Sequence, residues 1–388
     1  MTKMSVNEIV EGVWWVGALH PDRKLFDEII PLPDGTSYNT YLVRGSRQTA
    51  LIDTVDPAKT GELVANLKEL GVDRLDFVVS NHAEQDHSGS IPKILELFPE
   101  ARLVTNPTCK KMLMDLLHIE EDRFQTVKDG EEMDLGGKTL KFMLAPWVHW
   151  PETMFTFLVE DNILFSCDMF GSHFSQKALY SQDDDRTLDA AKRYYAEIMM
   201  PFRMWVKKHT ATVKGLAPAM IAPSHGPVWK SPGIILDAYE AWTSDETKDE
   251  ILVAYISMHN STKLMADHLV QALKEKGQKV KIFNLVEADI GELAMALVDA
   301  KTLVLGSPTF LTGPHPLAGH VAGLVGMLKP KTRKIAVFGS YGWGGRMVEQ
   351  LKADLGGLNA EILEPILVKG LPREADFKAL DELADKLI

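Results

Sequence analysis

The feature that most restricts the fold is a change of pattern at residues 243–250, a polar stretch without an apolar side chain. After it, short apolar runs alternate regularly with helical stretches, and a last helix is expected at about 373–387. Because each run is followed by a helix, this part predicts a doubly wound parallel sheet in a domain spanning residues 250–388. The predicted strands cover residues 251–257, 280–285, 301–306, 334–339 and 362–368.

The first part of the chain, residues 1–249, mixes strands and helices without that regular alternation. Several of its strands alternate apolar and polar residues, which predicts sheets with helices on their outer faces. The strands are expected at residues 13–17, 38–43, 49–53, 77–80, 103–104, 140–142, 155–159 and 163–166. The helices are expected at residues 61–70, 91–98, 108–117 and 188–208. The whole chain is therefore predicted to be of the α/β class, with two domains.

Composition excludes several kinds of protein. The formal net charge of -12 argues against a nucleic-acid partner. No apolar run has the length of a membrane span, and the N-terminus lacks the apolar core of a signal peptide. Two cysteines indicate a reducing compartment and cannot build a rubredoxin centre or a four-cysteine cluster. We therefore expect a cytoplasmic enzyme without a membrane partner.

Potential metal-ligating side chains are most concentrated in residues 81–89, NHAEQDHSG, directly after an apolar strand. His82, Glu84, Asp86 and His87 place four potential metal ligands within six residues. Without a metal, holding two carboxylates and two imidazoles together would be electrostatically costly. In an extended loop alternate side chains share a side, so His82, Glu84 and Asp86 are expected to converge. His87 would then point elsewhere or reach a second ion.

Three further candidate ligands, His149, Asp168 and His225, each follow a strand or loop signal. Loops at strand ends are where functional sites are usually built. Glu84, Asp86 and Asp168 supply three negative charges, which two divalent ions and a bridging hydroxide would balance. Asp168 comes alone from another strand end and is the natural bridging carboxylate. A mixed carboxylate and imidazole set suits iron, manganese or zinc, and its carboxylates favour iron.

The run HAEQDH, with His149, Asp168 and His225 after it, resembles the metallo-β-lactamase fold superfamily. That superfamily usually has histidine where Glu84 stands. The form with glutamate is similar to the flavodiiron proteins, also called A-type flavoproteins, of the rubredoxin:oxygen oxidoreductase family. The resemblance implies a metallo-β-lactamase-like αββα sandwich carrying a diiron site, followed by a flavodoxin-like domain that binds FMN.

The resemblance also implies a ligand set for the two iron ions. One iron would be held by His82, Glu84 and His149. The second would be held by Asp86 and His225, with Asp168 bridging the pair. His87 matches a position that ligates iron in some members and not in others, so its role stays open.

The second domain carries three loops that could hold a flavin. The first precedes a helix whose hydroxyls and amides form an anion nest, although its Ser261 and Thr262 could equally be a plain helix cap. Neither a P-loop nor a Gly-x-Gly-x-x-Gly motif is present, so the nest fits the monophosphate of FMN. In a 2-1-3-4-5 sheet the three loops converge, with Phe310 or Trp343 near the flavin ring. The candidates are Ser257, Met258, His259, Asn260, Ser261 and Thr262, then Ser307, Pro308, Thr309, Phe310, Leu311 and Thr312, and finally Ser340, Tyr341, Gly342, Trp343, Gly344 and Gly345.

A few residues near these motifs carry weaker signals. His173 could support the metal ligands from behind, and Tyr195 could border the metal pocket. His315 and His320 could approach the flavin, although positions on a helix surface fit them better. Cys167 is expected to be buried and structural, because it faces away from its neighbour in a strand.

The resemblance implies reduction of dioxygen to water, of nitric oxide to nitrous oxide, or of both, with FMN relaying electrons to the iron ions. It also implies a head-to-tail homodimer, or a dimer of such dimers, that brings one subunit's flavin to the other's metal site. The electron donor would be rubredoxin or a similar protein, because the chain lacks a cysteine-rich segment of its own. A reduced deazaflavin is the alternative donor.

Two other functions remain open from the sequence. The first is a zinc-dependent hydrolase of the metallo-β-lactamase fold with a regulatory flavodoxin module, in which a metal-bound hydroxide is the nucleophile. The second is an electron-transfer flavoprotein whose first domain binds no metal. Glu84 and the complete flavin loops weigh against the hydrolase, and the full carboxylate set weighs against the metal-free flavoprotein.

Overall fold

The computed structural model describes residues 6–182 and 184–388, and these form two compact units. One unit comprises the described residues up to Tyr195 together with Phe202–Thr243. The other comprises Ala196–Pro201 and Ser244–Ile388. The expected domain boundary between residues 249 and 250 stays a prediction, and the first strand of the second unit, β17, begins at Lys248.

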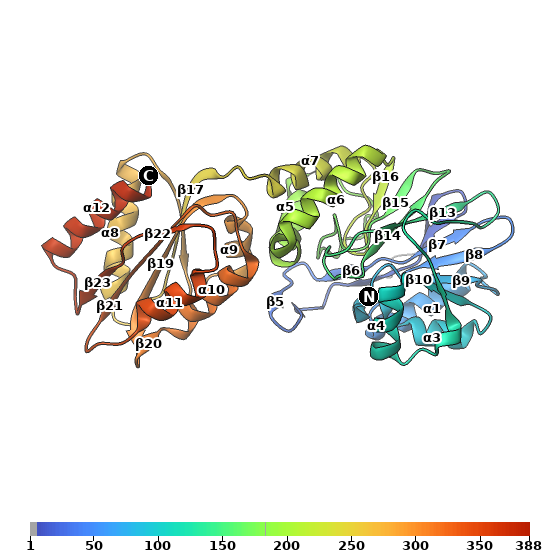
Figure 1. The fold of residues 1–388 in the computed structure, drawn as a ribbon, viewed down its shortest axis with the longest axis horizontal. Coiled ribbons are helices and arrows are strands. Elements are labelled where there is room, and N and C mark those ends of the chain that lie inside the picture. The colour runs from blue at the N-terminus through green and yellow to red at the C-terminus, as the bar shows by residue number, and fades with distance from the viewer. Residues whose placement is uncertain (1–5, 183) are drawn as a thin grey trace. The chain divides into compact units, whose positions relative to one another are not determined.

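The first unit is built on two sheets (Figure 1). One sheet is antiparallel at its β1 end and parallel from β8 to β11. Its strands, in spatial order, are β1 (Asn7–Val10), β2 (Val13–Trp15), β7 (Tyr41–Arg44), β8 (Thr49–Ile52), β9 (Phe77–Val79), β10 (Arg102–Thr105) and β11 (Phe124–Thr126). The other sheet is β12 (Glu132–Asp134), β13 (Thr139–Leu144), β14 (Met154–Leu158), β15 (Ile163–Phe165) and β16 (Met220–Ala222).

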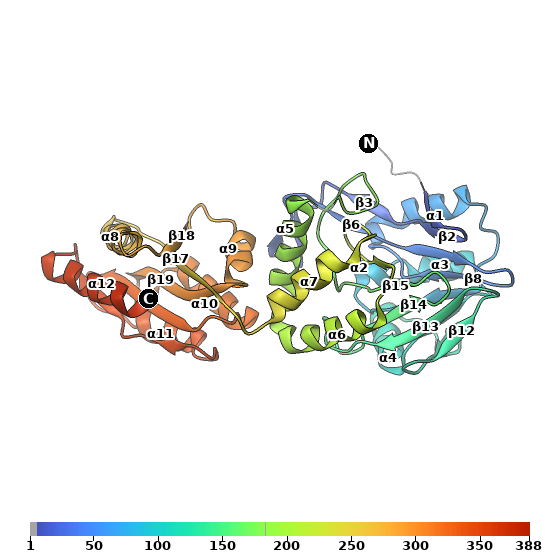
Figure 2. The same cartoon turned by 90° about the horizontal axis from the view of Figure 1, so that it is seen from above.

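Apolar side chains from both sheets pack together to form the core of the first unit, with Tyr41, Ile52 and Phe142 among them. A second apolar cluster joins the outer face of the first sheet to α1 (Thr60–Glu69), α3 (Ile91–Leu97) and α4 (Pro107–Leu117). Beside the second sheet lie α6 (Arg203–Leu216) and α7 (Pro232–Thr243), as Figure 2 shows. The layers are helix, sheet, sheet, helix, which confirms the predicted αββα sandwich.

Two short strand pairs lie outside these sheets. One joins β3 (Ala18–His20) to β6 (Thr36–Tyr38). The other is a hairpin of β4 (Leu25–Phe26) and β5 (Ile30–Pro31), whose turn places Asp27 at a positive φ. The rings of Phe26 and His173 lie 4.6 Å apart, so this hairpin packs beside the residues that follow Asp168.

The prediction of one continuous helix at residues 188–208 is wrong. α5 (Asp185–Tyr194) gives way to a π-helical turn, Tyr195–Met199, then to a 3-10 turn, Met200–Phe202, before α6 begins. Pro201 lies in the 3-10 turn and has no N–H to donate, so an α-helix cannot pass through it undisturbed. The helices α7 and α2 (Gln85–Ser88) were not predicted.

The second unit is the doubly wound sheet that the alternation predicts. Its strands lie in the order β18-β17-β19-β21-β22, which is 2-1-3-4-5, and all these neighbours are parallel. They are β17 (Lys248–Tyr255), β18 (Lys279–Asn284), β19 (Ala300–Phe310), β21 (Lys334–Tyr341) and β22 (Glu361–Ile362). β23 (Ile366–Lys369) pairs further along β21, and β20 (Gly313–Pro314) pairs antiparallel with β19.

Helices cover both faces of this sheet (Figure 1). α8 and α12 bury Met265, Leu269 and Leu380 with apolar residues of the central strands, so these two helices share one face. The helices are α8 (Ser261–Glu275), α9 (Ile290–Leu297), α10 (Pro316–Leu328), α11 (Met347–Leu355) and α12 (Glu374–Leu387). Among the described residues, no helix has both the length and the apolar character to span a bilayer.

Candidate metal centre and flavin pocket

The loop after β9 supplies the first ligands of the candidate metal centre. Its last residue before α2 is Glu84, at φ -59° and ψ 140°, after which the chain turns into the helix. Asp86 and His87 therefore project from a helical turn rather than from an extended loop. The predicted convergence of Asp86 with His82 and Glu84 is wrong for this reason, and Asp86 lies beside His87 instead.

One group of ligand atoms centres on the Glu84 carboxylate. Its Oε2 lies 3.1 Å from His82 Nε2 and 3.1 Å from His149 Nε2. Asp168 Oδ2 lies 3.6 Å from His82 Nε2 and 3.7 Å from His149 Nε2. These two imidazoles and two carboxylates form the first ligand group.

The second ligand group centres on the Asp86 carboxylate. Its Oδ2 lies 3.1 Å from His225 Nε2 and 3.3 Å from His87 Nε2. Asp168 Oδ1 lies 2.9 Å from His87 Nε2 and 3.5 Å from His225 Nε2. Asp168 thus presents one oxygen to each group, which is the geometry of a bridging carboxylate, and His87 faces the second group.

The atoms of each group are arranged to bind a metal ion rather than to form hydrogen bonds with one another. The ligand atoms of the first group lie within 4.8 Å of one another, and so do those of Asp86, His87 and His225 in the second. Both oxygens of Asp86 and the Nε2 atoms of His87 and His225 are buried without a hydrogen-bond partner among the described residues. Such buried polar atoms need a partner, and nitrogen and oxygen donors in this mixture suit iron, manganese or zinc.

The pKa values of the cluster histidines lead to the same conclusion. Burial opposes a charge on His87, but Asp86 and Asp168 raise its pKa to about 9. Burial also opposes a charge on His82, but its hydrogen bonds to Glu152 and Glu84 raise its pKa well above the ordinary value. The carboxylates therefore demand positive charge in this pocket. Protons meet that demand when metal is absent, and binding metal would release them.

Residues behind the ligands hold them in place, and the sequence did not point to all of them. Glu152 Oε1 lies 2.7 Å from His82 Nδ1. His225 Nδ1 lies 2.7 Å from the carbonyl oxygen of Ser37. The Tyr194 hydroxyl donates to Asp168 Oδ1 over 3.0 Å. No local motif marks Glu152, although its position three residues after a candidate ligand was a usable signal.

The weaker candidates near the cluster have mixed outcomes. The ring of His173 lies 4.9 Å from that of His225, so it does lie behind the ligands as expected. The expectation for Tyr195 is wrong by one residue, because Tyr195 donates to the carbonyl of Trp242 while Tyr194 reaches the cluster. Cys167 is buried beside Asp168, and burial raises its pKa well above the ordinary value, so its sulfur is a thiol.

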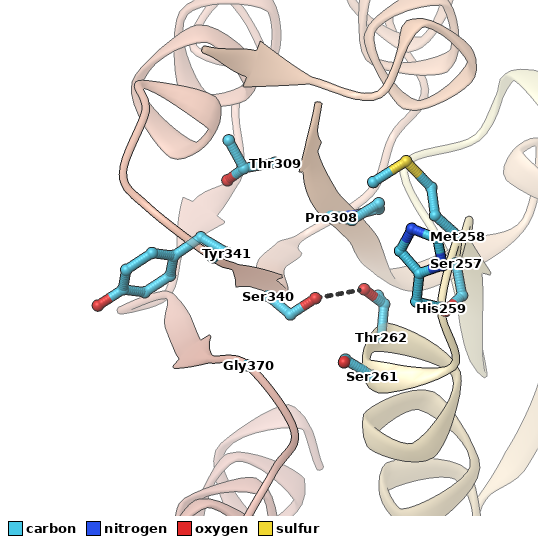
Figure 3. Close-up of a pocket in the computed structure, with 11 residues that line it drawn as sticks. Ser257, Met258, His259, Ser261, Thr262, Pro308, Thr309, Ser340, Tyr341 and Gly370 are labelled. Atoms are coloured by element: carbon cyan, nitrogen blue, oxygen red, sulfur yellow. Dashed lines mark hydrogen bonds between the residues drawn. The ribbon is translucent and has the colours of Figure 1, made fainter. Parts of the chain in front are cut away.

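The second unit has a pocket of about 190 Å³ at the carboxyl ends of its parallel strands (Figure 3). All three predicted loops contribute to it, and Gly370, after β23, is a fourth contributor that the sequence analysis missed. The hydroxyls of Thr262 and Ser340 lie 3.1 Å apart, joining the first and third loops. The lining residues are Ser257, Met258, His259, Ser261, Thr262, Pro308, Thr309, Ser340, Tyr341, Gly342 and Gly370.

The pocket fits a phosphate-bearing flavin. Ser257 Oγ is buried without a hydrogen-bond partner among the described residues. Ser261 begins α8, whose free backbone N–H groups and dipole favour an anion. The other predicted loop residues do not line the pocket and stay predictions: Asn260, Ser307, Phe310, Leu311, Thr312, Trp343, Gly344 and Gly345.

Some of these other residues have evident structural tasks. Ser307 Oγ accepts a hydrogen bond from the backbone N–H of His315 and donates to the carbonyl of Pro308. His315 caps α10 by accepting from the N–H of Leu317, in agreement with a helix position. Trp343 is 74% exposed, and its position beside a flavin stays a prediction.

Comparisons with known proteins agree with both sites. The family described as ODP family beta lactamase matches residues 36–226, and flavodoxin matches residues 253–382. The coenzyme F420H(2) oxidase of Methanothermobacter marburgensis is 35% identical over 99% of this chain and 98% of its own. The nitric oxide reductase of Moorella thermoacetica is 35% identical over 98% and 97%.

Solved structures show the same relationship. Rubredoxin oxygen:oxidoreductase from Desulfovibrio gigas superimposes with a TM-score of 0.95 and 28% identity, over 99% of this chain and 98% of that chain. The flavodiiron protein from Giardia intestinalis has a TM-score of 0.93 and 26% identity, over 100% and 97%. Both units of the chain are therefore matched together, in the same order.

Proposed function

Because the chain belongs to the flavodiiron protein family, we propose that it is an oxidoreductase that reduces dioxygen to water, nitric oxide to nitrous oxide, or both. The observation that carries this proposal is the pair of ligand groups joined by Asp168. Such a pair can hold two metal ions next to each other. A flavodoxin unit in the same chain can supply electrons to them.

The proposed cofactors are two iron ions and one FMN. His82, Glu84 and His149 would hold the first iron, and Asp86 and His225 the second, with Asp168 between them. His87 Nε2 lies 2.9 Å from Asp168 Oδ1 and 3.3 Å from Asp86 Oδ2, which supports its inclusion as a ligand of the second iron. The pocket at Ser257–Thr262 would hold the FMN phosphate, with the loops at 307–312 and 340–345 around the rest of the flavin.

When bound, the irons supply a binding position for the gas and, with the FMN, the electrons for its reduction. The residues of the chain do the remaining work. Tyr194 donates a hydrogen bond to Asp168 and orients that carboxylate between the two groups. Burial of His82, His87 and His225 keeps bulk water away from the reacting position.

The test is anaerobic stopped-flow mixing of the fully reduced protein with each gas at matched concentrations. Fast reoxidation of the flavin by at least one gas is expected, and the ratio of the two rates gives the preference. If neither gas reoxidises the flavin quickly, the proposal is wrong. If the purified protein contained zinc and no iron, a hydrolase would be favoured instead. Membership of the flavodiiron family argues against that outcome.

We propose that a separate electron donor reduces the FMN, either rubredoxin or a similar protein, or a reduced deazaflavin. Two comparisons support these choices, because one similar protein is named a rubredoxin oxygen:oxidoreductase and another a coenzyme F420H(2) oxidase. Reduction of the flavin under argon by each candidate would identify the donor. Cytoplasmic location, which brings such donors within reach, is part of the same proposal.

We also propose a head-to-tail homodimer, alone or paired into a dimer of dimers, in which one subunit's FMN serves the other's iron ions. The test combines Asp168→Ala, which is expected to lack metal, with Ser261→Asp, which places a carboxylate at the proposed phosphate position. Each homodimer should be inactive, whereas random reassociation should restore roughly a quarter of the activity, because half of the dimers have one intact pair of sites out of two. Mixed dimers without activity would mean that each chain works alone.

A further inference from the structure

His82 is held on both of its ring nitrogens by carboxylates. Its Nδ1 lies 2.7 Å from Glu152 Oε1, and the ring of Trp150 packs edge-on against it at 4.9 Å. Its Nε2 faces Glu84. The side chains of His82 and Glu152 are both fully buried. The imidazole therefore has a buried carboxylate on one nitrogen and the ligand group on the other.

Glu152 is itself fixed by the backbone around it. Its Oε1 also accepts a hydrogen bond from the N–H of Ala83, over 3.0 Å. Its carbonyl oxygen accepts from Asn106 Nδ2 over 2.6 Å. Asn106 caps α4, so the strand-end loop, the helix and the carboxylate form one connected unit. Since Ala83 donates to the same oxygen, the proton between Glu152 and His82 belongs to His82 Nδ1.

The second ligand group has a different arrangement behind its imidazoles. His225 Nδ1 meets a neutral carbonyl, that of Ser37. His87 Nδ1 has no hydrogen-bond partner among the described residues. Among residues 6–182 and 184–388, a carboxylate behind a cluster imidazole is thus found only at His82. The two groups share Asp168 but differ in this hydrogen bond, because the other buried carboxyl nearby, Asp53, is hydrogen-bonded to Asn81 and interacts electrostatically with both His87 and His82.

We propose that Glu152 is a positioning residue that makes the two metal sites unequal, so that the site of His82, Glu84 and His149 binds its ion first and more tightly. A carboxylate that accepts from a ligating imidazole fixes its tautomer and increases its basicity toward the metal. Glu152 does this through His82 Nδ1, which leaves Nε2 free for the ion. This inference rests on the proposed function, because it assumes that the cluster holds two metal ions.

The test is a cobalt(II) titration of full-length protein that retains FMN and has been freed of metal with a chelator. Glu152→Gln keeps the size and an oxygen acceptor but removes the charge. Its affinity for one cobalt ion is expected to fall roughly 10- to 100-fold, while the second affinity and the FMN content stay as in the wild type. The cobalt absorption band of the weakened site should be missing at one equivalent.

Asp27→Asn is the control for loss of a negative charge near the cluster without a hydrogen bond to a ligand, on a residue that is exposed whereas Glu152 is buried. Asp27 lies on the turn of the β4–β5 hairpin, where partial burial and then Glu84 and Asp86 raise its pKa, but no hydrogen bond joins it to a ligand among the described contacts. Both cobalt affinities of this variant are expected within about twofold of the wild type. The proposal is overturned if Glu152→Gln binds like the wild type, if it weakens both sites equally, or if Asp27→Asn has the same effect.

A second measurement applies to the unmodified protein, and so holds even if Glu152→Gln does not fold. Nitrogen-15 spectra of the histidines in zinc-loaded protein should show His82 protonated at Nδ1 and bound through Nε2. The opposite tautomer overturns the proposal. Neither readout involves gas turnover, so a protein that reacts with neither gas would overturn the proposed function alone.

Discussion

At the scale of single residues, Asp168 has the most consequential position in the molecule. It follows β15 in a tight turn that is held by the hydrogen bond from Ser166 Oγ to the carbonyl of Met169. The residue before it, Cys167, has a positive φ of 52°. This local bend aims the carboxylate between the two ligand groups, where each of its oxygens serves one group.

Replacement of Asp168 by alanine should remove iron from the protein while FMN is retained. Both groups lose an oxygen donor, whereas the flavin pocket draws its residues from the other unit. Iron by elemental analysis should fall at least roughly tenfold, given the usual effect of losing ligand-shell contacts. FMN absorbance per chain should be unchanged, and loss of FMN as well would show that the two units do not bind their cofactors independently.

At the scale of elements, the caps of the helices connect local structure to the site. Asn106 accepts from the backbone N–H groups of Thr108 and Cys109 at the start of α4. It also donates to Glu152, so the same side chain stabilises a helix and a support of the metal cluster. Asp184 caps α5 by accepting from Thr187, without such a second contact among its described hydrogen bonds.

This difference predicts unequal costs for removing the two caps. Asp184→Ala should lower the free energy of unfolding by about 1 kcal/mol, the usual value of an N-cap. Asn106→Ala should cost about 1 kcal/mol more, because the buried Glu152 carbonyl also loses its partner. Urea unfolding of both metal-free variants measures this, and equal costs would contradict the coupling of α4 to the cluster.

Two glycines of α10 give a second comparison within one element. A Cβ on Gly326 would lie 2.5 Å from the carbonyl oxygen of Asp354, whereas one on Gly323 would meet nothing within 4 Å. Gly323→Ala should therefore stabilise the second unit by roughly 0.5–1 kcal/mol, since glycine is a poor helix former. Gly326→Ala should destabilise it by roughly 1–3 kcal/mol through overpacking. Thermal unfolding, monitored through the release of FMN, would measure both changes in stability. If both variants shifted stability in the same direction, the packing of α10 against the end of α11 would be refuted.

At the scale of the whole molecule, each unit has its own core. The core of the second unit draws on β17, β19, β21, α8 and α12, all of which follow Ser244. The pocket residues come from the same part of the chain. A unit that contains both its core and its ligand pocket should fold and bind alone.

We therefore expect a fragment of residues 244–388 to fold cooperatively and to bind one FMN. Circular dichroism and flavin absorbance are the measurements, with the fragment carrying Ser261→Asp as the control that folds without FMN. A fragment that folds but binds flavin far more weakly than the full chain would show that the first unit completes the pocket. A fragment that fails to fold would show that this core needs residues before Ser244, such as Ala196–Pro201 of the same unit.

Much of this organisation was accessible from the sequence because it depends on local pattern. Regular alternation of strands and helices after residue 250 predicted a doubly wound parallel sheet, since parallel strands need helical crossovers, and the structure gives its strand order as 2-1-3-4-5. The end of each parallel strand then marked a loop at one edge, which located the three flavin loops. The residue types of His82, Glu84 and Asp168, which offer nitrogen and oxygen donors, likewise narrowed the choice of metal ion from sequence alone.

The remaining features were decided by tertiary structure. The sequence determined which residue types stand at the strand ends, but only the fold brought Glu152 to His82 and Tyr194 to Asp168. Contacts over such separations depend on how sheets and helices pack, and no short-range pattern encodes that packing. The turn of α2 likewise places Asp86 with His87 and His225, as the family resemblance implies, whereas an extended loop would have pointed it toward His82 and Glu84.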